Sequence, residues 1–299
     1  MLTLTQRSVA SPFSWTRLRP YLQVMPLVAV MMVFVVAPLC FVVAVSFFRY
    51  DNFEVIPDFS LENYQSVLTS HLTLSLYLTM LKLAAFTWVF TLLIGFSVAY
   101  FLVFHVRNRT VAIGLFLLCT VPFWTSNVIR MISWLPLLGK QGVINSALMF
   151  LGLTDKPLTF LLFSDFSVIV SYVHLFTIFM IVPIFNTMSR IDRSLFEAAT
   201  DAGAGRFGTL VLVVLPLTKS GIVLGSIFVV TLVMGDFYVV RVMSGGTDAS
   251  VVSAMYDDIS TLLFPHAAAS AVILVTLLTL MVAAILRVVN VRGELTGGR

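Results

Sequence analysis

Long apolar stretches separated by short polar connectors dominate the chain. A membrane-spanning helix needs about 20 mostly apolar residues, because it must cross about 30 Å of hydrocarbon with its backbone groups bonded internally. The stretches that meet this requirement are 21–48, 76–104, 111–138, 166–188, 219–240 and 266–289. The first is longer than the hydrophobic core of a signal peptide, so we expect it to be retained. The pattern predicts an all-α integral membrane protein with six transmembrane helices in residues 21–289.

The composition supports this class. Apolar residues make up 59% of the 299 residues and charged residues only 11%. Too little polar surface remains to cover such a chain in water, which excludes a soluble globular enzyme, a disordered regulator and a small disulfide scaffold. Cys40 and Cys119 lie inside apolar runs and the histidines are scattered singly, so no disulfide framework or metal site is predicted.

The distribution of charge predicts the orientation. The net charge is +4, but the 18 Lys and Arg residues are dispersed and form no basic stripe for nucleic acid. If the amino terminus is cytoplasmic, most of them fall on the cytoplasmic side of the membrane. Those predicted to lie on the external side are Arg49, Lys140, Lys156 and Arg241. Both terminal segments, 1–20 and 290–299, are therefore predicted to be cytoplasmic, together with the long connector 189–218.

This connector carries a distinctive motif. It reads Glu197-Ala198-Ala199 and reaches Gly203 four residues later. The pattern predicts a short helix, with an acid in the first turn and a glycine at its C-terminal end. A second amphipathic stretch is expected to follow from Arg206 until Pro216 ends it; its apolar stripe is Phe207, Leu210, Val211 and Val214.

The motif resembles the EAA loop of the type I permeases of binding-protein-dependent ABC importers. Glu197-Ala198-Ala199, Gly203 and Leu215-Pro216 match, and Val213 replaces the commoner Ile. The resemblance implies that the short helix sits in a groove of a separate cytoplasmic ATPase dimer. It implies that Glu197 and Arg206 are surface contacts to the ATPase and that Gly203 is the corner that directs the helix. Ala198 and Ala199 would form the small face of the helix that lets the ATPase approach closely. The chain has no phosphate-binding loop of its own, so ATP and Mg are expected on the partner and no cofactor on this chain.

Further motifs resemble the spermidine/putrescine branch of these permeases. They are Ile129-Arg130, Trp134, Gly142, Asn145, Leu148, Gly152-Leu153, Pro157-Leu158, Pro183, Ile191-Asp192, Leu195, Gly235-Asp236-Phe237 and Ser244-Gly245-Gly246. The resemblance implies a bacterial inner-membrane importer of polyamines or a similar organic cation. A periplasmic binding protein would deliver the solute, and a second, homologous permease would complete a heterodimer. The branch also contains carriers of ferric iron, amino-phosphonates and other small organic ions, and these alternatives stay open.

Three charged residues fall inside the predicted spans, where an isolated charge is costly. Asp236, with Tyr238 nearby, offers a carboxylate and an aromatic face to a cationic amine; the alternatives are an ion pair with Arg130 or Lys82, or a bend capped by water. Arg130 and Trp134 are read either as pathway residues or as interfacial anchors. Lys82 is expected to reach toward the headgroups. Tyr100 either lines the pathway or packs against neighbouring side chains.

Two other classes of function fit the sequence less well. A membrane-embedded transferase requires paired acids or histidines at mechanistic spacing, and the sequence contains no such pair. An ion-coupled carrier is typically built from inverted repeats, and no convincing internal repeat is present. Neither class explains the motif from Glu197 to Pro216.

Overall fold

The computed structural model describes residues 15–51, 54–192, 194–246 and 250–288. Its elements, in chain order, are α1 (Trp15–Met31), η1 (Met32–Val36), α2 (Ala37–Val45), β1 (Arg49–Asp51), β2 (Glu54–Ile56), α3 (Glu62–Thr69), α4 (His71–Tyr100), η2 (Phe101–His105), α5 (Arg109–Thr120), η3 (Val121–Trp124), α6 (Asn127–Ile132), α7 (Trp134–Leu138), α8 (Val143–Phe150), η4 (Thr159–Leu161), α9 (Asp165–Met188), α10 (Ser194–Asp201), α11 (Arg206–Thr209), η5 (Leu210–Val214), α12 (Leu215–Leu217), α13 (Lys219–Met234), α14 (Tyr238–Met243), α15 (Val251–Ser260) and α16 (Phe264–Val288). The predicted tail 290–299 and residues 1–14 of the predicted amino-terminal segment lie outside the described residues.

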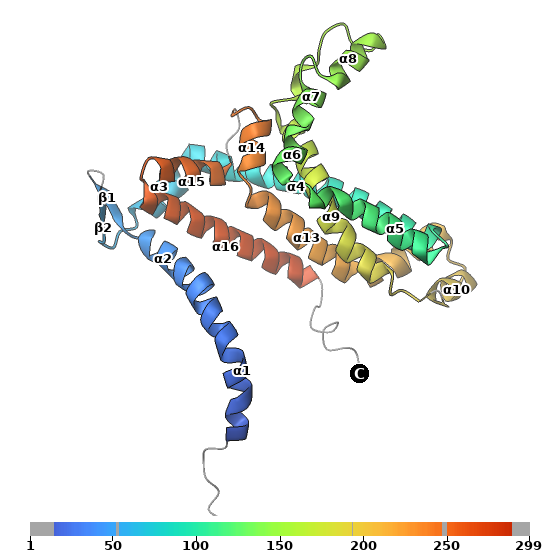
Figure 1. Ribbon diagram of the computed structural model, residues 1–299, viewed down its shortest axis with the longest axis horizontal. Helices are drawn as coiled ribbons and strands as arrows, with labels where there is room; N and C mark the ends of the chain where they lie inside the picture. The colour runs from blue at the N-terminus through green and yellow to red at the C-terminus, as the bar shows by residue number, and fades with distance from the viewer. Residues whose placement is uncertain (1–14, 52–53, 193, 247–249, 289–299) are drawn as a thin grey trace, which may run out of the picture.

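The predicted all-helical membrane fold is confirmed, but one bend falls inside the predicted third span and another directly precedes the fifth. Four helices are long and apolar enough to cross a membrane unbroken, and two further helix pairs, bent by 91° and 65°, bring the total to six if each pair is one span. The unbroken ones are Gln23–Val45, His71–His105, Asp165–Met188 and Phe264–Arg287. In Figure 1 the first of these stands apart from the other helices.

The prediction of a continuous third span over 111–138 is wrong. The helix ends at Trp124 after a 3-10 turn, Thr125 is extended, and α6 starts a new direction at Asn127, 91° away. Pro122 has no backbone N–H and cannot continue the α-helical bonding pattern. Arg130 and Trp134 therefore lie beyond the break, on the short helices α6 and α7.

The fifth span is also shorter than the predicted 219–240. Helix α13 ends at Met234, and the chain turns through Gly235 and Asp236 before α14 begins. The Oδ1 atom of Asp236 accepts a hydrogen bond from the N–H of Val239, at 2.8 Å, in the first turn of α14. A side chain that caps a new helix in this way favours a break over continuation.

Helix α9 lies at the centre of the bundle, between α4 and α13 (Figure 1). Helices α4 and α9 run in the same direction, and α13 runs against them, since Met180 of α9 contacts both Gly95 and Gly225. Trp88 of α4 donates a hydrogen bond to Ser226 of α13 at 2.7 Å. We call the end at which α9 leads into α10 and α13 begins the inner end, and the opposite end the outer end.

The contact between α9 and α13 depends on a pair of glycines one turn apart. A Cβ atom on Gly225 would lie 2.6 Å from the Met180 sulfur, and one on Gly221 would lie 2.6 Å from the Pro183 carbonyl oxygen. Small residues at this spacing let the backbones of membrane helices approach closely. The close approach carries much of the packing energy, because lipid supplies little hydrophobic driving force between helices.

The outer end carries short helices and a hairpin of β1 and β2 in which Arg49 faces Ile56. Helices α6 to α8 project from the body as an arm (Figure 1). The arm is held together by the buried Asn145 side chain, which donates to the carbonyls of Gly139 and Leu158 and accepts from the N–H of Leu158. The clamp depends on the Asn145 side chain and on the backbone of Leu158.

We expect Gly221→Ala to lower the midpoint of thermal unfolding in detergent. The added methyl group meets the backbone oxygen of Pro183, which belongs to a packed helix, and overpacking of this kind costs about 1–3 kcal/mol. Gly114→Ala is the matched control, because a Cβ atom there meets nothing within 4 Å. Equal unfolding midpoints for the two variants would contradict the packing role.

Candidate functional site

The connector at the inner end begins with a side-chain cap. The Oδ1 atom of Asp192 accepts a hydrogen bond from the N–H of Ser194, the first residue of α10, at 3.0 Å. This bond favours the ionised carboxylate and lowers the pKa of Asp192 below its ordinary value. Helix α10 thus starts three residues before Glu197, which lies in its first turn, where a negative charge suits the helix dipole.

Gly203 ends α10 as the sequence predicts. Its φ is +83°, a conformation that strains any residue with a Cβ. Its N–H bonds to the carbonyl of Thr200 and the N–H of Ala204 bonds to the carbonyl of Ala199, both at 2.9 Å. This pair of bonds is the Schellman motif, which satisfies the last carbonyls of a helix and turns the chain sharply.

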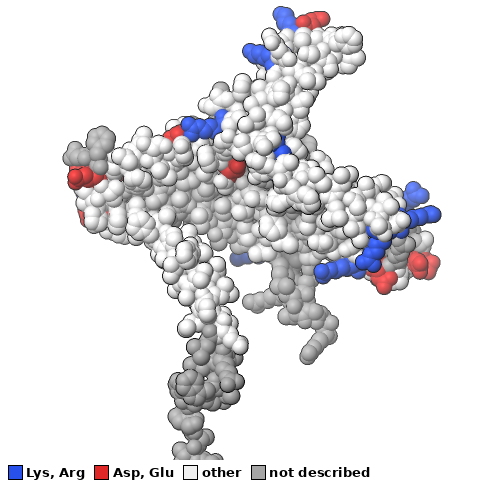
Figure 2. All heavy atoms as spheres, in the orientation of Figure 1, with Lys and Arg blue, Asp and Glu red and all other residues white. Residues whose placement is uncertain are grey.

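The predicted contact residues present themselves at the surface. Glu197, Ala198, Gly203 and Arg206 are exposed, and Ala199 is half-buried. Figure 2 shows Lys, Arg, Asp and Glu side chains gathered over the end that carries α10, whereas the body of the molecule between its ends shows little charge. The prediction that Pro216 ends the second stretch is off by one residue: helix α12 ends at Leu217, and α13 starts after a 65° bend.

Aromatic side chains join α10 to the end of α4. The ring of Phe196 in α10 lies 4.9 Å from that of Phe104 in η2, and Phe104 lies 5.0 Å from Tyr100. Segment η2 is a π-helical turn, and another, η5, follows α11. Such turns are frequent at functional sites. We call Phe196, Phe104 and Tyr100 the aromatic joint; only Tyr100 was picked out from the sequence, and for another role.

Asp236 forms a polar cluster at the outer end of α13. It is half-buried, and its Oδ1 atom accepts hydrogen bonds from the Tyr172 hydroxyl, at 3.3 Å, and from the N–H of Val239. Tyr172 is fully buried in α9. The bend is therefore present, but its partners are protein groups, whereas the sequence suggested a cap by water. In the described part of the chain, Asp236 forms no ion pair with Arg130 or Lys82.

Lys82 does not simply reach toward the headgroups. It forms an ion pair and hydrogen bond with Asp165, the first residue of α9. The two residues are 83 positions apart in the sequence, which is why the pattern of the chain gave no sign of the pair. The contact ties the first half of α4 to the start of α9.

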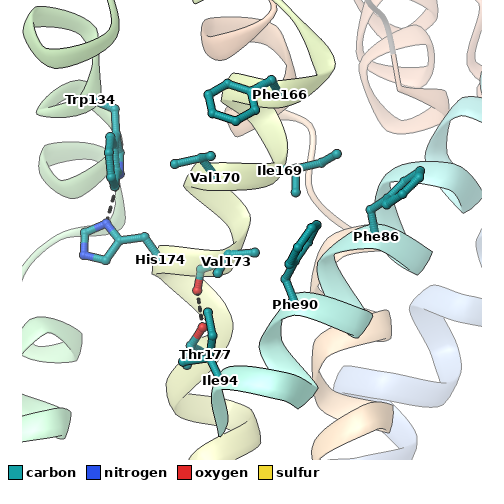
Figure 3. Close-up of a pocket in the computed structure, with 10 residues that line it drawn as sticks. All are labelled: Phe86, Phe90, Ile94, Trp134, Phe166, Ile169, Val170, Val173, His174 and Thr177. Atoms are coloured by element: carbon teal, nitrogen blue, oxygen red, sulfur yellow. Dashed lines mark hydrogen bonds between the residues drawn. The ribbon is translucent and has the colours of Figure 1, made fainter. Parts of the chain in front are cut away.

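Trp134 and Arg130 belong to a second cluster. The Trp134 indole donates a hydrogen bond to Nδ1 of His174, at 3.0 Å, and both line an apolar groove of about 740 Å³ between α4, α7 and α9 (Figure 3). Arg130 is 6% exposed and donates to the Asn127 side chain, while its buried Nε has no partner among the described residues. The groove is lined by aromatic and aliphatic side chains without a carboxylate, so it offers a cation no counter-charge.

The five predicted pathway residues do not converge on one site. Tyr172 and His174 are two residues apart on α9 and diverge by about 200°, which places the Asp236 cluster and the Trp134 cluster on opposite faces of that helix. Tyr238 is 38% exposed on α14. Tyr100 ends α4 at the inner end, beside α10.

The known proteins that this chain resembles are transporters. It is 30% identical to the spermidine/putrescine transport system permease protein PotB of Escherichia coli over 262 residues, 86% of this chain and 93% of that protein. PotB of Haemophilus influenzae is 34% identical over 71% of this chain and 73% of its own length. The inner membrane ABC transporter permease protein YdcU of Escherichia coli is 28% identical over 64% of this chain and 65% of its own length. No protein-family model matches the chain.

Solved structures agree on the fold. A chain of a bacterial ABC transporter that imports the acidic polysaccharide alginate superposes with a TM-score of 0.71 over 92% of this chain and 97% of its own length, at 16% identity. In a structure of a bacterial alginate ABC transporter in complex with an alginate pentasaccharide-bound periplasmic protein, the matching chain superposes with a TM-score of 0.69. The match covers 91% of this chain and 95% of that chain, at 14% identity. With the identity to PotB over nearly all of that protein, and the helical architecture described above, this chain belongs to the family of ABC importer permeases that includes PotB.

Proposed function

We propose that this permease carries a polyamine or a similar small organic cation across the inner membrane, as one half of a heterodimer. As a member of its family it is a multi-pass inner-membrane protein and the transport subunit, not the catalytic ATPase. ATP and Mg belong to the partner ATPase in such systems. A periplasmic binding protein would supply the solute, and a homologous permease would complete the pathway.

The observation that supports the solute class is the carboxylate of Asp236. It lies at the outer end of α13, where a solute released by a binding protein would enter, and it keeps part of its surface exposed. The relatives named for spermidine and putrescine transport cover most of the chain. Ferric iron and amino-phosphonates stay as alternative cargoes, and the buried Arg130 would be the natural group to meet an anion.

The coupling mechanism that we propose starts at α10. The exposed Glu197, Ala198 and Arg206 would contact the ATPase dimer, and Gly203 would set the angle of the helix. Movement of the ATPase would reach the spans in two ways: to α4 through the aromatic joint, and to α13 through the stretch that contains Leu215 and Pro216 and ends at Leu217. Alternating access then means two packings of the same helices, each favoured by a different state of the ATPase.

We expect Gly203→Ala to leave the protein in the membrane and to reduce uptake. A residue with a Cβ at φ +83° costs about 1–2 kcal/mol, and the strain falls on the corner that positions α10. Gly205→Ala is the matched control, because Gly205 has φ −72° and open space around its Cβ position. Uptake assays in vesicles compare the two; unchanged uptake in Gly203→Ala would contradict the role of the corner.

Glu197→Lys should abolish uptake without loss of membrane insertion, because it reverses the charge of a residue that we propose contacts the ATPase. The same uptake assay measures the effect.

Phe196→Ala should uncouple ATP hydrolysis from transport. Without the ring, motion of α10 no longer presses on Phe104, and we expect solute taken up per ATP hydrolysed to fall about fivefold or more, the lower range of common coupling energies. Both quantities are measured on the reconstituted complex. Phe104→Ala should give the same loss, and the double variant should add little to it, because the two rings form one contact. Additive losses would mean that the rings act separately.

Asp236→Asn should weaken uptake of a dication about tenfold or more, in line with the loss of a charged hydrogen-bond partner. The amide oxygen still accepts from Val239, so the bend is kept. Tyr172→Phe is the control, because it removes the neutral partner and keeps the charge. Transport of radiolabelled spermidine is compared with that of an anionic solute; equal effects on both would point to a structural role for Asp236.

A further inference from the structure

A groove at the inner end combines two arginines with an apolar floor. It has a volume of about 430 Å³ and lies between η2, the start of α5 and the end of α9. Its lining residues are Leu102, Val103, Phe104, Val106, Arg107, Arg109, Ala112, Ile113, Phe185, Ser189 and Ile191. The groove shares Phe104 with the aromatic joint, and none of its other lining residues is part of the pathway or of the ATPase contact proposed above.

The positive charge of the groove is not neutralised within the described residues. Arg107 and Arg109 are exposed, neither forms an ion pair with any residue that the structure describes, and no carboxylate is among the lining residues. The side chain of Asn108, between them, accepts from the N–H groups of Thr110 and Val111 and so caps α5. The two guanidinium groups therefore remain available for an anion from outside the chain.

The apolar part of the groove leads from the arginines into the bilayer. Ile113 follows Arg109 by four residues and Leu117 follows Ile113 by four, so the three lie on one face of α5. Ile113 is 45% exposed and Leu117 is 54% exposed. Ala112 and Phe185 line the groove beside them, and Phe185 stacks on Phe116 at 4.4 Å, which holds this wall in place.

We propose that this groove binds a phospholipid of net negative charge. Its phosphate would lie between Arg107 and Arg109, and one acyl chain would follow Ala112, Ile113 and Leu117. An acidic protein segment would satisfy the arginines but leave the apolar floor uncovered. A zwitterionic lipid would bring its own cation next to two guanidinium groups. Only an anionic amphiphile matches both halves, and basic pockets between helices at the cytoplasmic face suit such headgroups.

The test uses the complete importer, with its ATPase and second permease, in nanodiscs of phosphatidylcholine with increasing phosphatidylglycerol. Phosphatidylglycerol retained per complex after detergent exchange is measured by mass spectrometry. We expect saturable retention by the unmodified protein. One arginine near an anionic headgroup is worth about fivefold in affinity, so the double variant Arg107→Gln/Arg109→Gln should bind about 25-fold more weakly. Arg287→Gln, at the inner end of α16 and outside the groove, is the matched control and should bind normally.

A second variant separates the lipid site from a fault in folding or assembly. Ala112→Phe fills the floor of the groove and leaves both arginines in place, so it should also lose the lipid. Equal retention by all variants would overturn the proposal. Displacement by millimolar inorganic phosphate would show a site for free phosphate instead. Loss of the ATPase from the double variant with normal lipid retention would assign the arginines to the ATPase.

Discussion

The requirement that every backbone polar group find a partner away from water governs this structure. In a bilayer a helix can break only where side chains or neighbouring helices satisfy the freed groups. The breaks described here obey that rule. The Thr218 hydroxyl donates to the carbonyl of Val214 at the bend before α13, and Asp236 accepts from Val239 at the bend after it. The bends give the short helices at both ends of the bundle their directions.

Helix α9 is the element around which the other helices are arranged. Lys82 of α4 binds its first residue, Asp165, and glycines of α4 and α13 bring those helices against Met180. One face of α9 carries Tyr172 and the contact with Asp236, and the opposite face carries His174 and the contact with Trp134. Contacts on several sides fix the position of α9 relative to α4 and α13, and so fix the separation of the two clusters on its opposite faces.

Much of the architecture could be predicted from the sequence because the bilayer imposes a simple length and polarity rule. The spans that contain α4, α9 and α16 begin and end within a few residues of the predicted limits. The glycine corner at Gly203 could also be predicted, since a positive φ selects glycine almost regardless of context. The break in the third span could not, because the chain stays apolar through Pro122 and hydropathy carries no information on direction. A bend at Asp236 was one of the alternatives that the sequence offered, and the structure adds its partner Tyr172. The glycine pair Gly221 and Gly225 is visible in the sequence, and its spacing is typical of closely packed membrane helices.

The sequence by itself determined that the chain is an all-helical membrane protein with up to six spans and that its connector turns at Gly203, because these properties depend on hydrocarbon thickness and local backbone conformation. Only the tertiary structure decided which side chains contact one another. The pairs Lys82 with Asp165, Tyr172 with Asp236, Trp134 with His174 and Phe104 with Phe196 join residues that are distant in sequence. Helix packing selects such pairs through close approach of backbones and the cost of leaving a buried polar group unpaired, and neither quantity can be read from one segment alone.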